Sequence, residues 1–267
     1  MANCSRPDWL RGVVAAIAIS LGVFVLAWAG LWLGAWLAPR LPRDHLSNDA
    51  RSSAQIGIGM MSTLAALVLG FMITSARSSF DRATDDVVAV STSIVMLDRA
   101  LSGYGDEARP VRDQLRAFLD RATRRVASDG NVEEVVFRVP LTNLSLLTQL
   151  QRSILELKPT DDTQRWFQAR ALTLSGELSR ERVITSEQSV QSVPVLLLVV
   201  VAAWVFLIFI GLGAFSVHNR SVRVVLVCSA LAFAGSVFLI LEFETPYSGV
   251  IRVSGQPLLN AAEELAR

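Results

Sequence analysis

The sequence has few of the residues from which catalytic and metal sites are built. Among 267 residues it holds two histidines, His45 and His218, and two cysteines, Cys4 and Cys228. No two of them have the spacing of metal ligands, and two cysteines are too few for a disulfide framework. The chain also lacks a glycine-rich phosphate loop and a nucleophile motif. We therefore expect no catalytic residue, no metal site, no cofactor and no enzymatic activity.

Charge is also scarce. Charged residues make up 18% of the chain, the formal net charge is +1, and Lys158 is its one lysine. A nucleic-acid binder needs a basic excess to neutralise phosphates, so we expect no nucleic-acid partner. In contrast, 52% of the residues are hydrophobic and the mean hydropathy is +0.43. This composition is typical of a membrane protein, and the lipid bilayer is its first expected partner.

Long uncharged runs dominate the two ends of the chain. A helix needs about 20 apolar residues to cross the hydrocarbon core of a bilayer, and runs of about that length cover residues 12–38, 52–76, 195–217 and 224–241. The sequence therefore predicts an all-α polytopic membrane protein with four transmembrane helices and an extramembrane helical layer between the second and third. The expected parts are a transmembrane pair in 1–76 (spans about 13–37 and 55–76), a helical region in 77–192, a transmembrane hairpin in 193–242, and a tail, 243–267, that docks on the helical layer.

Apolar spacing indicates helices between the second and third spans. Five residues recur at intervals of three and four and predict one apolar seam of a helix that continues from the membrane: Val87, Val90, Ile94, Leu97 and Leu101. Asp161 and Gln164 resemble a capping box that opens a later helix. Val132 to Val139 is ambiguous, and we expect it to be helical or irregular. After the fourth span, Glu242 and Glu244 are expected to end that helix at the membrane interface.

The second span carries small residues at helical spacing: Gly59, Ser62, Thr63, Ala66, Gly70 and Thr74. In lipid, small residues let another helix approach closely, so helix packing is one interpretation. The alternative is that the stripe faces a pore in an oligomer. In that case the pore would be lined by Gly59, Thr63, Ala66, Gly70 and Thr74, and Leu67 or Phe71 would form a hydrophobic gate that closes by dewetting.

Three tryptophans of the first span, Trp28, Trp32 and Trp36, recur every four residues and therefore share one helix face. Indole rings of this kind anchor a span at the interface or pack against lipid. The alternative interpretation is an aromatic ligand site.

Three tracts resemble a known bacterial membrane family with a bestrophin-like domain, DUF4239. They are GFMITSARSSFD (residues 70–81), LDRALSGYGDEARPVRDQLR (97–116) and ETPYSGVIRVSGQPL (244–258). Bestrophins are pentameric anion channels with four membrane helices and cytoplasmic helices between the second and third. The resemblance implies a multi-pass protein of the bacterial inner (plasma) membrane, a homo-oligomer and small inorganic anions as partners. It also implies that the helical layer and both termini lie in the cytoplasm. The arginines near the span ends do not decide this orientation by the positive-inside rule, because similar numbers lie on the two sides.

Two functional hypotheses follow. In the first, the chain is an oligomeric anion channel whose second span lines the pore. Arg77 and Arg82 at the pore mouth would raise the local anion concentration; the alternative role for these arginines is interfacial anchoring. In the second hypothesis, the chain is a non-conducting, membrane-anchored sensor or scaffold that binds a partner through its helical layer.

Overall fold

The computed structural model of the chain describes residues 8–40, 48–129, 141–188, 195–215, 220–247 and 249–266. Within these ranges the regular structure is helical, so the predicted all-α class is confirmed. The expectations for Val132 to Val139, His45 and His218 fall outside the described residues. In chain order the helices are α1 (Asp8–Leu37), η1 (Ala38–Arg40), α2 (Asn48–Tyr104), η3 (Asp106–Ala108), α3 (Arg109–Asp129), α5 (Leu141–Leu155), α6 (Asp162–Gln188), α7 (Val195–Phe215), α8 (Arg220–Glu244) and α9 (Gln256–Ala266).

The chain folds as two compact units. The membrane unit comprises Met1–Phe80 and Ser192–Ile251, and the helical unit comprises Asp81–Gln191 and Arg252–Arg267. The helix α2 contributes residues to both, because it continues without a break from Asn48 to Tyr104. This continuity confirms that the apolar seam after the second span belongs to the same helix as the span.

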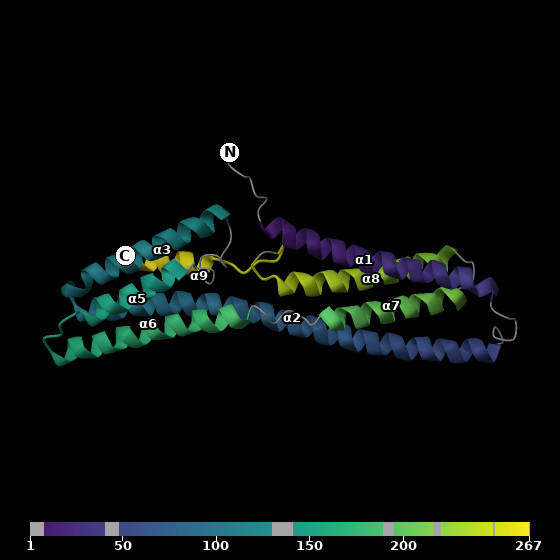
Figure 1. Ribbon diagram of the computed structural model, residues 1–267, viewed down its shortest axis with the longest axis horizontal. Coiled ribbons are helices and arrows are strands. Elements are labelled where there is room, and N and C mark those ends of the chain that lie inside the picture. The colour runs from purple at the N-terminus through teal and green to yellow at the C-terminus, as the bar shows by residue number, and fades with distance from the viewer. Residues whose placement is uncertain are drawn as a thin grey trace. The chain divides into compact units, whose positions relative to one another are not determined.

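Four helices of the described chain are long and apolar enough to cross a bilayer, as predicted. The segments are Gly12–Arg40, Ser52–Tyr104, Leu196–Phe215 and Ser221–Glu244. In the membrane unit, α1 lies beside α7 and α8, and α7 runs beside the first part of α2 (Figure 1). In lipid only structures that satisfy their own backbone hydrogen bonds can span the hydrocarbon region, which explains why each uncharged run is helical.

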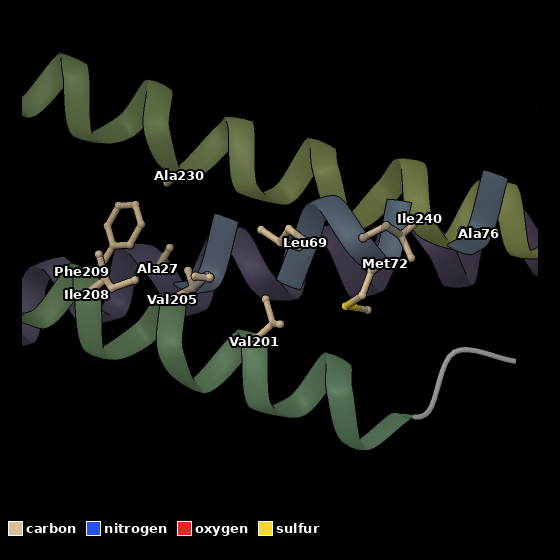
Figure 2. Close-up of a cluster of buried hydrophobic side chains, with 11 residues drawn as sticks. Ala27, Leu69, Met72, Ala76, Val201, Val205, Ile208, Phe209, Ala230 and Ile240 are labelled. Carbon is tan, nitrogen blue, oxygen red and sulfur yellow. The ribbon is translucent and has the colours of Figure 1, made fainter. Parts of the chain in front are cut away.

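The core of the membrane unit brings these four helices together. Buried side chains meet from α1, α2, α7 and α8, among them Ala27, Met72, Val205 and Ile240 (Figure 2). Phe209 is 1% exposed and meets Phe233 of α8 edge to face, with ring centroids 6.2 Å apart. Such packing matters more in a bilayer than in water, because apolar burial by itself does not favour helix association in lipid.

Glycines bring α1 and α7 into close contact. A Cβ atom added to Gly30 would lie 2.8 Å from the carbonyl oxygen of Phe206, and Gly34 and Gly213 likewise face backbone atoms of the opposite helix. A larger residue at these positions would force the two backbones apart. These three glycines therefore serve close packing between α1 and α7.

The helix α8 ends at the pair of glutamates that the sequence predicted to end it. Glu244 is its last residue, and Glu242 is 1% exposed. Its Oε1 atom accepts hydrogen bonds from the backbone N–H groups of Val250 and Ile251, the latter at 3.0 Å. The chain reverses direction after the helix, which brings these two N–H groups back to the carboxylate. Glu242 therefore stabilises the turn that follows α8.

In the helical unit, the predicted seam of α2 is confirmed as a buried face. Val87, Val90, Ile94, Leu97 and Leu101 are each at most 2% exposed. Within this unit, the second part of α2 lies beside α3, α5, α6 and α9 (Figure 1). The side chains of α9 that are buried are Leu258, Ala261 and Leu265.

Polar contacts fix the helices of this unit. Arg112 of α3 donates two hydrogen bonds to the carboxylate of Asp98 in α2, both at 2.8 Å. This bond raises the pKa of the Arg112 guanidinium, which therefore stays charged. At the start of α6, the N–H of Gln164 donates to Asp161 at 2.6 Å, while the Gln164 amide oxygen accepts from the N–H of Thr160. The predicted cap is confirmed, with the return bond one residue earlier than in the standard box.

Candidate functional site

The candidate site lies on the part of α2 that belongs to the membrane unit. One face of this segment is buried in the core of the membrane unit: Ala65, Leu69, Met72 and Ala76 are at most 5% exposed. These positions are separated by four, three and four residues, so they form a single stripe along the helix. The opposite side of the helix is left uncovered by the other described residues.

The small residues predicted to line a pore all lie on the uncovered side. Gly59, Thr63, Ala66, Gly70 and Thr74 are exposed. A Cβ atom added to Gly59 or Gly70 would meet no atom within 4 Å. Within the described chain, the small size of these two glycines is therefore not used for packing, in contrast to that of Gly30, Gly34 and Gly213. The stripe is available either to a second copy of the chain or to a pore.

The two threonines of the stripe already use their hydroxyl protons. Thr63 Oγ1 donates to the carbonyl oxygen of Gly59 at 3.0 Å, and Thr74 Oγ1 donates to that of Gly70 at 2.9 Å. In these rotamers each hydroxyl presents an oxygen lone pair outward and no proton. To donate to an anion, each threonine would have to rotate about χ1 and give up its bond to the helix backbone.

A second stripe, of bulky apolar residues, runs beside the small one. Leu67 and Phe71, the predicted gate residues, are 71% and 69% exposed. They belong to a longer series of exposed side chains, Ile56, Met60, Leu64, Leu67 and Phe71. At about 100° per residue, the two stripes are centred roughly 80° apart on the helix. The gate candidates therefore stand at the edge of the small-residue stripe and not within it.

The predicted pore-mouth arginines also lie on α2, five positions apart. Both are exposed; Arg77 belongs to the membrane unit, whereas Arg82 belongs to the helical unit. The guanidinium carbon of Arg77 is 5.7 Å from the ring centroid of Phe243 in α8, close enough for a cation–π contact. Phe243 also meets Phe80 edge to face at 5.7 Å. Arg77 is thus held beside an aromatic pair at one end of the membrane unit.

Sequence reasoning missed two features of this unit. The bulky stripe as a whole escaped notice, although its spacing of four, four, three and four residues is visible in the sequence. The role of Glu242 could not be read in the same way, because its hydrogen-bond donors come from residues beyond a turn.

Comparison with solved structures shows the fold. A crystal structure of a bacterial bestrophin homologue from Klebsiella pneumoniae, in a point-mutant form, matches with a TM-score of 0.61 at 16% identity, covering 91% of this chain and 97% of that chain. Another crystal structure of a bacterial bestrophin homologue from the same organism matches with a TM-score of 0.60 at 15% identity, covering 90% and 96%. At such identities the likeness is one of fold.

The family is shown by the sequence itself. A search of curated proteins found no match. The family model of the bestrophin-like domain, in contrast, matches residues 21–258, which include the greater part of the first membrane helix, the other three membrane helices and most of the helical unit. The DUF4239 resemblance is consistent with this match. The chain is therefore a membrane protein that belongs to the bestrophin-like domain family.

Proposed function

We propose that copies of this chain assemble in the bacterial plasma membrane into an oligomeric channel for small inorganic anions, with α2 lining the pore. The observation that carries the proposal is the uncovered side of α2, where a stripe of small residues runs opposite the buried stripe Ala65, Leu69, Met72 and Ala76. Membership of the bestrophin-like family supports conduction, since bestrophins are anion channels.

Several copies are needed because one helix face cannot enclose a pore. With the copies arranged about a common axis, each would contribute its α2, and the two adjacent stripes would face the axis and a neighbouring copy. Gly59, Thr63, Ala66, Gly70 and Thr74 leave space for a hydrated ion, and Leu67 and Phe71 narrow the passage at the edge of that stripe. Arg77 and Arg82 raise the anion concentration at one mouth. The helical unit and both termini face the cytoplasm in this arrangement.

The first test is anion flux through the purified full-length chain in sealed liposomes. Chloride is compared with a large organic anion for the wild type and for Gly70→Trp. We expect chloride to pass in preference to the large anion, and flux to vanish in Gly70→Trp while the oligomer remains intact. Gly235→Trp is the matched control, because Gly235 is an exposed glycine of α8 with equally open surroundings. Its flux should equal that of the wild type.

Two results would contradict the pore. If Gly70→Trp abolishes assembly together with flux, the stripe is a packing surface between copies. If the wild type carries no flux under varied calcium, pH and voltage, the sensor or scaffold hypothesis takes its place. A cavity of about 260 Å³ in the helical unit favours that second candidate, since its lining is largely apolar and includes Leu115, Phe118, Leu147 and Leu150. The next experiment would then be a search for what binds there.

A further inference from the structure

The outer face of α1 is one continuous apolar stripe that the described part of the chain leaves uncovered. Its members are exposed and recur at intervals of three and four residues: Val14, Ile17, Leu21, Val25, Trp28, Trp32 and Trp36. The other side of α1 carries the buried Ala16, Val23 and Ala27 and the glycines that approach α7. At about 1.5 Å per residue the stripe is about 33 Å long, enough to cross the hydrocarbon core of a bilayer.

A cation is fixed at one end of this stripe. The guanidinium carbon of Arg40 lies 3.5 Å from the centroid of the Trp36 ring, and Arg40 Nη1 donates to the carbonyl oxygen of Trp36 at 2.8 Å. The arginine is exposed, and among the described residues no carboxylate lies within ion-pairing distance of it. Stacking on the indole holds the guanidinium close to the helix end and leaves most of its N–H donors available.

The depth of the tryptophans separates this site from an ordinary aromatic belt. An interfacial preference explains Trp36, which is next to the end of the span. It does not explain Trp28, which lies eight residues away and hence about 12 Å further along the helix. Trp28 and Trp32 are nevertheless 45% and 65% exposed. The result is a rigid, flat aromatic surface that leads from a positive charge into the apolar layer.

We propose that this face binds an anionic phospholipid. The N–H groups of Arg40 donate to the phosphate of the headgroup, and one acyl chain packs along Trp36, Trp32 and Trp28. Charge complementarity selects an anionic over a zwitterionic lipid, since one basic residue close to the surface discriminates between them. The site depends on the membrane location of α1 and not on ion conduction, so it stands or falls separately from the channel proposal.

Tryptophan quenching by brominated lipids tests the proposal on the full chain. A background with Trp9→Phe, Trp166→Phe and Trp204→Phe retains only the three indoles of the stripe. This protein is reconstituted in phosphatidylcholine vesicles that contain brominated phosphatidylglycerol or brominated phosphatidylcholine at equal mole fraction. We expect phosphatidylglycerol to associate about fivefold more strongly. The preference should shrink as salt is raised, because exposed charges are screened.

Arg40→Gln should bring the two association constants together. Arg223→Gln is the matched control, since Arg223 is an exposed arginine near the start of α8 with no ion pair among the described residues; it should leave the preference intact. Trp36→Leu, which keeps the charge but removes the ring that positions it, should weaken the preference. Circular dichroism confirms that each variant folds, and added inorganic phosphate should not compete.

Three results would overturn the proposal. Equal quenching by both lipids in the wild type would mean that the stripe contacts lipid without selecting it. Absence of quenching by either lipid would mean that a second copy covers the indoles. A preference that survives Arg40→Gln would place the anionic headgroup elsewhere.

Discussion

At the scale of single residues, the most informative position is Glu242. A carboxylate within a membrane span is costly unless it meets donors or another charge. Here Oε1 accepts hydrogen bonds from two backbone N–H groups, while Oε2 is buried without a hydrogen-bond partner in the described structure. The turn that supplies these donors passes close to the carboxylate, and Gly249 in this turn has no room for a side chain. A Cβ atom added there would collide with Glu242 Oε1.

This contact predicts that Gly249→Ala destabilises the membrane unit. The added methyl group displaces the carboxylate from the N–H groups of Val250 and Ile251, and hydrogen bonds to a charged group contribute roughly 1.5–3 kcal/mol each. We expect a lower thermal unfolding midpoint in detergent. Gly235→Ala is the control, because a Cβ there meets nothing within 4 Å. Equal midpoints for the two variants would show that the turn yields without cost.

At the scale of elements, α2 is the helix that carries three different faces through the membrane unit. Its buried stripe packs in the core. Its small-residue stripe and its bulky apolar stripe are both exposed and run next to each other along the helix. The uncovered half of the helix thus has two surfaces of different chemistry. In the proposed channel, the small stripe sets the width of the pore and the bulky edge sets its gate.

The gate hypothesis predicts that Phe71→Ala raises chloride flux. Removing the ring widens the constriction and lowers the barrier that dewetting imposes. The measurement is the initial rate of chloride efflux from liposomes at equal protein content. Leu231→Ala serves as the control, since Leu231 is a similarly exposed bulky residue, 64% exposed, on a different helix, α8. A decrease in flux with the assembly intact would instead assign Phe71 to contacts between copies.

At the scale of the whole molecule, the proposed channel must attract anions despite a stripe whose threonines present no protons. In this structure Thr63 and Thr74 donate to their own helix, so in the proposed channel we assign anion preference to positive charge at the mouth. Arg77 and Arg82 are the candidates on α2. Charge at a pore mouth concentrates counter-ions and acts over distances of about a Debye length.

The double variant Arg77→Gln with Arg82→Gln should therefore reduce chloride flux in a salt-dependent way. At low ionic strength we expect a loss of up to about tenfold, and at high ionic strength the variant and the wild type should converge, because the Debye length falls to about 3 Å at 1 M salt. A loss that is equal at every salt concentration would indicate that the arginines support the structure and do not steer ions.

The sequence by itself determined the fold class, the four spans and the buried seam of α2. These follow from local physics: a bilayer of fixed thickness requires uncharged helices of about 20 residues, and in the extramembrane helical region a helix shows its buried face as a 3.6-residue repeat. The cap at Asp161 was readable for the same reason, because its partner is three residues away.

Only the tertiary structure decided which faces of the membrane helices are covered. In a span that is apolar all round, hydrophobic periodicity does not distinguish a face that packs against protein from one that faces lipid or another copy. Small residues were equally ambiguous: Gly30, Gly34 and Gly213 serve close packing between α1 and α7, whereas Gly59 and Gly70 face open space. The partners of Glu242 lie beyond a chain reversal, so they too became visible only when the helix and its turn were folded together.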